Sequence, residues 1–139
     1  MPPRRSGAVS SGNGIDRMQK SLLGALLIGG ALLSPPAFAE GDAAAGKQVF
    51  AQCSICHSAK PGENKMGPSL FGVVGRKSGT EAGFSYSDAV KKLDLTWNEE
   101  TLEKWLANPA AMAPGTKMVF RLNSDKQRDN VIAYLKTLK

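Results

Sequence analysis

Both cysteines and the only histidine of this 139-residue chain lie within five consecutive positions, at Cys53, Cys56 and His57. Two thiols three residues apart, followed at once by an imidazole, suit three kinds of chemistry: a redox dithiol, a partial metal site, or covalent attachment of haem. No other cysteine or histidine occurs in the sequence. Other features of the chain must therefore show which of these three kinds of chemistry it supports.

The first two kinds of chemistry lack the residues that they need. A structural zinc site normally takes four Cys or His ligands, and the chain holds three. A thioredoxin-like dithiol is expected at the start of a helix that follows a strand, whereas Cys53 and Cys56 fall at the end of a predicted helix. A disulfide between them would close a very small loop and contribute little stability. It would also leave His57 unexplained. A zinc-bound structural module is the least favoured alternative, because the fourth ligand is missing.

The pattern Cys-x-x-Cys-His is typical of c-type haem attachment. Positions three apart on a helical turn are neighbours, so both thiols can bond to one side of a porphyrin while His57 becomes an axial iron ligand. Bis-histidine ligation is excluded, which leaves Met66, Met112 and Met118 as thioethers beyond the N-terminal segment. Met66 follows His57 too closely to cross to the opposite face, and core packing is preferred for Met66 and Met112. Met118 ends the turn-forming stretch PGTKM and is the better candidate.

The N-terminus has the pattern of a secretory signal. Lys20 precedes an apolar run over residues 22–33, and Ala37 and Ala39 form an A-x-A cleavage site. The run is shorter than the roughly 20 residues that a membrane span requires. The sequence therefore predicts an N-terminal extension and signal peptide over residues 1–39, and an exported domain over residues 40–139. Met18 fits as the initiator, because the segment ahead of it is long and polar for a signal.

Residues 40–139 are expected to form one small domain with a single core. A chain of this size often depends on a cofactor or cross-link for stability. Removal of residues 1–39 leaves 14 basic and 11 acidic residues, a net charge of +3. This charge is too small to indicate nucleic-acid binding, and it is compatible with docking on an acidic protein surface.

Helical periodicity recurs along the domain, and no segment alternates convincingly with period two, so the predicted class is all-α. The expected helices are residues 42–57, 85–93, 96–109 and 124–139. The expected N-terminal signals are Asp42, Ser85 or Ser87, Thr96 with Glu99, and Ser124 with Gln127. Two irregular stretches, residues 58–84 and 108–120, carry apolar side chains, and such long loops are usually functional. We expect these side chains to pack against a buried group. This pattern indicates that the chain surrounds a non-protein group.

These motifs resemble those of the class I cytochromes c, close to the mitochondrial protein and the short bacterial cytochromes c2. The resemblance extends from Gly41 to Lys139, and its motifs occur in family order: CSICH, GPSLFGVVGR, GFSYSDA, TW, NP, PGTKMVF and VIAYLK. It implies a small cytochrome c fold, with three to five helices and long loops wrapped around one covalently bound haem. This haem c would be attached through Cys53 and Cys56.

The resemblance also implies roles for individual residues. Met118 would be the distal ligand opposite His57, and the carbonyl of Pro68 would accept the other ring N–H of His57. The haem propionates would be held in the interior by three residues, Arg76, Tyr86 and Trp97, since buried carboxylates need donors. Gly46 and Phe50 would meet Tyr134 where the first and last helices cross.

The sequence departs from the family pattern near the expected iron site. Trp105 stands where many relatives have a tyrosine near the distal methionine, and Val90 stands where an internal amide is common. We expect both changes to remove hydrogen-bonding groups that tune the reduction potential. The ring of docking lysines is also thinner than in relatives, and its expected members are Lys65, Lys117 and Lys47, with Lys60 and Arg121 as further candidates.

The expected function is a periplasmic one-electron carrier and not an enzyme. It would accept electrons from a cytochrome bc complex or another dehydrogenase and donate them to a terminal oxidase or photosynthetic reaction centre, through weak electrostatic docking. We expect a monomer that is not embedded in the membrane and binds no nucleic acid. The alternative is a haem-based peroxidase or gas sensor in which Met118 leaves the iron.

Overall fold

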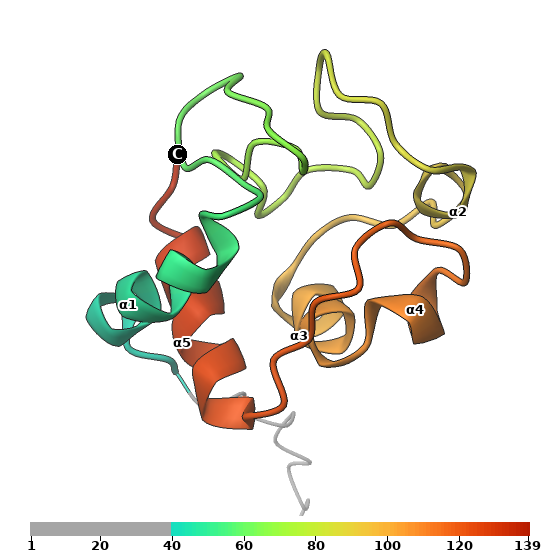
Figure 1. The fold of residues 1–139 in the computed structure, drawn as a ribbon. Coiled ribbons are helices and arrows are strands. Elements are labelled where there is room, and N and C mark those ends of the chain that lie inside the picture. Colours follow the sequence, from blue (N-terminus) through green and yellow to red (C-terminus); the bar gives the residue numbers. More distant parts are fainter. Residues whose placement is uncertain (1–39) are drawn as a thin grey trace, which may run out of the picture. The chain divides into compact units, whose positions relative to one another are not determined.

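The computed structural model describes residues 40–139, which form five helices (Figure 1). They are α1 (Ala43–Cys53), α2 (Asp88–Lys91), α3 (Glu99–Ala107), α4 (Pro109–Met112) and α5 (Asp125–Leu135). Within this range the β pairing amounts to one isolated antiparallel bridge between Lys77 and Thr96. The all-α prediction is therefore confirmed. The predicted extension and signal, with cleavage after Ala39 and the alternative initiator Met18, lie outside the described residues.

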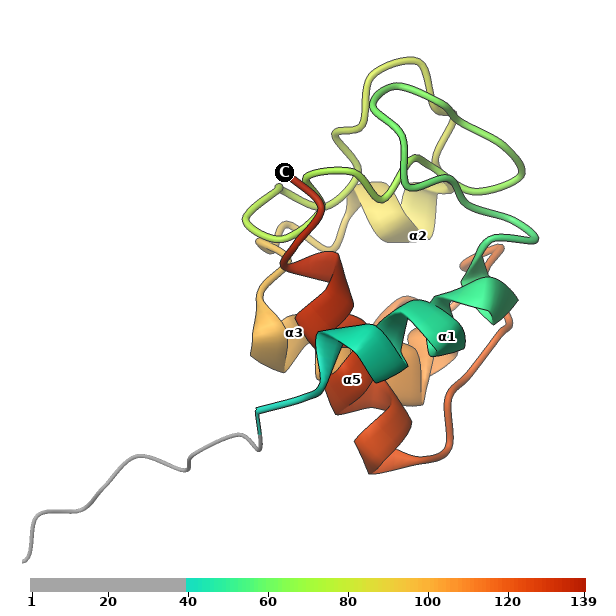
Figure 2. The same cartoon turned by 90° about the vertical axis from the view of Figure 1, so that its left-hand side faces the viewer.

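The first and last helices cross at the position that the sequence predicts. Figures 1 and 2 show α1 lying against α5 in both views. At Gly46 a Cβ atom would overlap the backbone carbonyl of Asn130 in α5, so only glycine allows the two helices to approach this closely. The rings of Phe50 and Tyr134 lie beside this crossing, with centroids 5.2 Å apart and planes at 58°. The prediction for this crossing is confirmed.

Side-chain caps fix where the described helices begin, as α1, α2 and α5 show. Asp42 accepts hydrogen bonds from the backbone N–H groups of Ala44 and Ala45 at 2.8 and 3.2 Å, so it is the N-cap of α1, as predicted. Ser87, the second of the two expected candidates, caps α2. Ser124 caps α5 by accepting from the backbone N–H of Gln127, the third residue of the helix, at 3.4 Å. Each cap satisfies a donor that the helix itself leaves unpaired.

The sequence placed several helix boundaries wrongly and missed a short helix. Three helices end at Lys91, Ala107 and Leu135, short of the predicted residues 93, 109 and 139. Asn98, and not Thr96, is the N-cap of α3, and it exchanges hydrogen bonds with Thr101 at 2.8 and 2.9 Å. Thr96 lies two residues before this cap, where it pairs with Lys77 and its carbonyl accepts from the Thr101 hydroxyl at 2.9 Å. Helix α1 ends at Cys53 instead of continuing to residue 57, and α4 is one turn within the stretch expected to be irregular.

The core lies among α1, α3 and α5 and receives side chains from the long connection between α1 and α2. Its largest members include the following residues: Phe50, Val73, Val90, Trp97, Leu102, Trp105, Leu122, Val131, Ile132 and Leu135. Backbone hydrogen bonds attach the connection to its surroundings: Gly67 N–H donates to the Cys56 carbonyl at 2.8 Å, and Gly72 N–H to the Leu138 carbonyl at 2.8 Å. Figure 1 shows the C-terminal end beside this loop. In residues 40–139 no helix has the length and apolar character needed to cross a membrane.

Candidate functional site

Cys53 and Cys56 lie where α1 gives way to a tight turn. Backbone hydrogen bonds from Cys56 and His57 N–H to the Cys53 carbonyl, at 3.1 and 2.9 Å, bring the two cysteines and the histidine into one turn. Both thiols are free and partly accessible. Burial raises the pKa of the Cys53 thiol to about 11, with a smaller contribution from Cys56, so this group is a neutral thiol at neutral pH. The turn therefore presents two free thiols and an imidazole within five consecutive positions.

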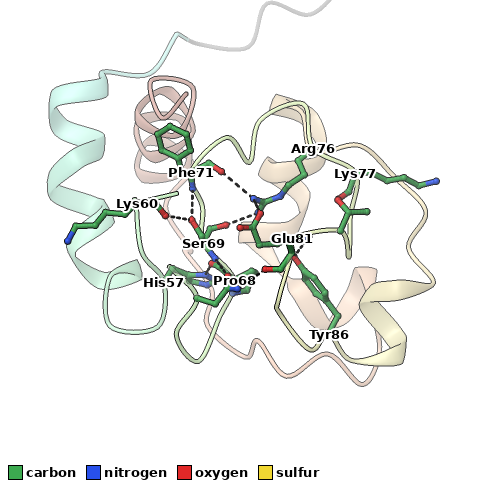
Figure 3. Close-up of polar contacts among 12 residues, drawn as sticks. His57, Lys60, Pro68, Ser69, Phe71, Arg76, Lys77, Glu81 and Tyr86 are labelled. Carbon is green, nitrogen blue, oxygen red and sulfur yellow. Dashed lines mark hydrogen bonds and ion pairs between the residues drawn. The ribbon is translucent and has the colours of Figure 1, made fainter. Parts of the chain in front are cut away.

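The imidazole of His57 is oriented by the segment that follows the turn (Figure 3). Its Nδ1 lies 2.7 Å from the carbonyl oxygen of Pro68, so with the proton on Nδ1 the ring donates to Pro68 and keeps Nε2 as a ligand. Burial lowers the pKa of His57, although the Pro68 carbonyl acts in the opposite direction. Gly67 lies directly against the ring, where a Cβ atom would overlap it. The site therefore favours a neutral, fixed imidazole.

Met118 is held by a tryptophan. The indole Nε1–H of Trp105 donates to Met118 Sδ at 3.2 Å. Trp105 is itself buried and packs edge to face against Trp97, with ring centroids 5.3 Å apart. The expectation that Trp105 removes a hydrogen-bonding group is therefore wrong, because the indole supplies a donor of its own. The loss of a hydrogen-bonding group at Val90 stays a prediction, and the Val90 side chain is a buried hydrocarbon.

The other two methionines differ from Met118 in their surroundings. Met66 is 82% exposed, so the prediction that it packs in the core is wrong. It lies in the loop between Lys65 and Gly67, whose backbone groups bond to each other across it at 2.9 Å. Met112 is partly buried against the core, as expected. Of the three thioethers, Met118 has the hydrogen bond that fixes its sulfur.

Arg76 is the centre of a polar cluster on the connection between α1 and α2 (Figure 3). Its Nη1 donates to the Phe71 carbonyl at 3.3 Å and to Glu81 Oε2 at 2.5 Å, and its Nη2 donates to the Ser69 carbonyl at 2.8 Å. Its Nε is buried and has no partner among the described residues. A buried donor of this kind is costly unless an acceptor arrives. The cluster therefore has room for one more anionic or carbonyl group at Arg76 Nε.

Tyr86 belongs to the same cluster, and Trp97 lies in the core. The hydroxyl oxygen of Tyr86 accepts the backbone N–H of Glu81 at 3.2 Å, which leaves the hydroxyl proton available for another acceptor. Trp97 is buried, and its backbone bonds to both sides of Arg76: its carbonyl accepts from Gly75 at 2.7 Å and its N–H donates to the Arg76 carbonyl at 2.8 Å. Arg76 is therefore linked to Tyr86 through Glu81, and to Trp97 through the backbone.

Glu81 was not anticipated from the sequence. It is the carboxylate partner of Arg76, and both side chains are only 14% exposed. No periodic pattern links Arg76 to Glu81, because the intervening residues form an irregular glycine-containing loop. The pair is recognised only when the loop is folded back on itself.

The three lysines expected to form a docking surface are exposed on different segments. Lys65 Nζ donates to the Ser54 carbonyl at 3.0 Å, so it lies beside the cysteine turn. Lys117 directly precedes Met118, and Lys47 lies on α1. Among residues 40–139 none of the three forms an ion pair. Their charges are therefore available to a partner.

The donor set suits haem c and gives no support to zinc. Two free thiols, a neutral imidazole and a fixed thioether match the attachment points and axial ligands of that group, and Arg76 Nε matches a propionate. Within the part of the chain that the structure describes, no three side chains of His, Cys, Asp or Glu converge as metal ligands would.

Comparisons with known proteins agree with this chemistry. The family model described as Cytochrome c matches residues 43–139. The chain is 51% identical over 117 residues to a protein named cytochrome c2 from Rhodomicrobium vannielii, covering 80% of this chain and 91% of that protein. It is 48% identical over 101 residues to a cytochrome c from Euglena viridis, covering 71% and 99% of the two chains. Among solved structures it resembles cytochrome cH from Methylobacterium extorquens, with a TM-score of 0.66 and 50% identity over 70% of this chain and 99% of that one.

Proposed function

Because this chain belongs to the class I c-type cytochromes, which are haem-containing electron carriers and not enzymes, we propose that it is a periplasmic one-electron shuttle with His57 and Met118 as axial ligands. Haem c supplies a one-electron couple between Fe(III) and Fe(II) when it is bound. The remaining work, which is attachment, orientation and exclusion of other ligands, belongs to the residues of the chain.

Each predicted residue has one task in this proposal. Cys53 and Cys56 would hold the haem covalently by their thiols, and Pro68 would fix the plane of the His57 ring through the 2.7 Å contact. Trp105 would hold the sulfur of Met118 in place. The propionates would be received by Arg76, Tyr86 and Trp97.

The observation that carries the proposal is the Trp105–Met118 hydrogen bond. A thioether whose sulfur is fixed at 3.2 Å from an indole donor is preorganised as a ligand. With His57 and Met118 both bound to the iron, no position would be open for oxygen or peroxide. This favours electron transfer over the alternative, a haem peroxidase or gas sensor in which Met118 is displaced.

Spectroscopy of the purified holo-protein tests the ligation. A covalent haem stain on a denaturing gel should be positive, and the absorption spectra should show six-coordinate, low-spin iron in both oxidation states without added ligand. A high-spin form, or rapid carbon monoxide binding by the ferrous protein as isolated, would favour the alternative. The variant M118A should become high-spin or take up exogenous ligand, while M66A, at the exposed thioether, should keep the wild-type spectrum.

The proposed partners are a cytochrome bc complex or another dehydrogenase as donor, and a terminal oxidase or photosynthetic reaction centre as acceptor. The support is the unpaired positive charge at Lys65, Lys117 and Lys47. Electron-transfer rates with isolated oxidase and reaction centre should fall as salt rises, because steering between opposite charges is screened. Replacement of each lysine by glutamine should slow the reaction at low salt more than K126Q, at an exposed lysine on α5 that the proposal does not include. Equal effects of all four variants would refute these docking residues.

A periplasmic location follows from the predicted signal peptide. N-terminal sequencing of the exported protein should begin at Glu40, and a protein that retains residues 18–39 would contradict this part of the proposal.

A further inference from the structure

The Arg76–Glu81 pair is an ion pair whose cation still has a free buried donor. Glu81 Oε2 engages Nη1 of Arg76 at 2.5 Å, while the Phe71 and Ser69 carbonyls take two more guanidinium hydrogens. The buried Nε remains without a partner among residues 40–139. Glu81 therefore occupies one edge of the guanidinium and leaves another edge for a second acceptor.

The backbone of Glu81 also constrains Tyr86. Because the Glu81 N–H donates to the Tyr86 hydroxyl oxygen at 3.2 Å, the hydroxyl keeps its own proton for a different acceptor. Figure 3 shows the side chains of Arg76, Glu81 and Tyr86 gathered around one point of the loop. One residue thus positions two of the three expected propionate donors.

We propose that Glu81 is a positioning residue that lowers the reduction potential of this cytochrome by placing a second carboxylate on Arg76. This inference rests on the proposed function, because it takes Arg76 as a propionate donor. The charge of Glu81 balances that of the guanidinium, so a propionate bound at Arg76 would give the cluster an excess negative charge. Negative charge near the haem favours Fe(III) over Fe(II), and it is little screened because both side chains are mostly buried.

An ion pair at Lys77, the residue after Arg76, provides a matched control. Lys77 and Asp94 also form an ion pair, at 2.7 Å, but their side chains are 62% and 76% exposed. D94N removes the same unit of charge from a solvated pair, and asparagine tolerates the positive φ of 45° at this position. Water and salt should screen this change much more than a change at Glu81.

The test compares midpoint potentials from potentiometric titrations, in which dithionite donates electrons to Fe(III) and ferricyanide accepts them from Fe(II). E81Q keeps an acceptor for Arg76 and loses only the charge, so its potential should be more positive than that of the wild type. E81D keeps the charge and should stay close to the wild type, and D94N should change little. The E81Q shift should also persist at high salt.

Several results would overturn the proposal. An unchanged E81Q potential, an E81Q shift no larger than that of D94N, or an E81D shift as large as that of E81Q would each show that the charge of Glu81 is not the cause. Should E81Q fail to retain haem, E81A carries the same test because it is also neutral. Absorption spectra separate the proposed function from the role of Glu81. The absence of a low-spin spectrum in the wild type refutes the proposed function, whereas low-spin spectra in wild type and variants with unshifted potentials refute only the role of Glu81.

Discussion

The hydrogen bond from Trp105 to Met118 should raise the reduction potential, and W105F should lower it. Phenylalanine keeps an aromatic ring against Trp97 but removes the Nε1–H that lies 3.2 Å from the sulfur. A donor on the sulfur withdraws electron density from the thioether and so weakens it as a ligand to Fe(III) more than to Fe(II). Without the donor, Fe(III) is relatively more stable.

The size of the effect follows from the strength of the bond. A neutral hydrogen bond contributes about 0.5–1.5 kcal/mol, and sulfur is a weak acceptor, so about 0.5–1 kcal/mol is expected here. For a one-electron couple, 59 mV corresponds to a tenfold change in the equilibrium constant, or about 1.4 kcal/mol. If the whole bond energy distinguished the two oxidation states, the potential would fall by about 20–40 mV. The smaller ring should also cost about 1–3 kcal/mol of unfolding free energy, because Trp105 is only 8% exposed.

Potentiometric titration and denaturant unfolding measure these two quantities separately. W105Y is the matched variant, since a hydroxyl can replace the lost donor and should bring the potential back toward the wild-type value. A W105F potential equal to the wild type, or equal shifts in W105F and W105Y, would refute the reasoning. A fall in stability without a change in potential would show that Trp105 acts only by packing.

Three further substitutions test how the chain positions the site. G46A should cost about 3 kcal/mol or more in denaturant unfolding, because its methyl group would overlap the α5 backbone, and a loss below about 1 kcal/mol would contradict this close approach. G67A should displace the His57 ring and lower the fraction of low-spin holo-protein in absorption spectra, so an unchanged spectrum would show that the loop moves instead. R128M should cost about 3–5 kcal/mol, because Arg128 is 7% exposed and pairs with carboxylates of α3 and α5. K136M, at an exposed pair, should cost less than about 1 kcal/mol, and equal losses in these two variants would refute the role of burial.

The parts of the fold that the sequence predicts correctly are those with local causes. Asp42 and Ser87 are polar residues directly ahead of helical periodicity, so their capping roles follow from neighbouring residues. Gly46 and Tyr134 were placed together by resemblance to a family, and the Cβ overlap at Gly46 gives this pairing its physical reason. Thr96 misled the prediction because its cap spacing is local, whereas its actual conformation depends on a bridge to Lys77, which is distant in the sequence.

The parts of the site that could not be predicted depend on contacts across long loops. Nothing about the residue types of Trp105 and Met118 says that the indole nitrogen points at the sulfur. The same holds for Met66, whose exposure depends on the loop conformation and not on its hydrophobicity. Glu81 is the clearest example, since its contact with Arg76 exists only after the connection has folded back.

The two side-chain contacts that the sequence does not predict have opposite electrostatic consequences. At Met118 the indole is a donor that can neither accept a hydrogen bond nor release its proton in the ordinary pH range, so it acts on the sulfur with one fixed polarity. At Arg76 the carboxylate of Glu81 brings a full negative charge into a mostly buried pair. The first should raise the potential and the second should lower it. Because the two groups share no partner, their effects should add, so that W105F and E81Q together should nearly restore the wild-type potential wherever the single shifts are of equal size.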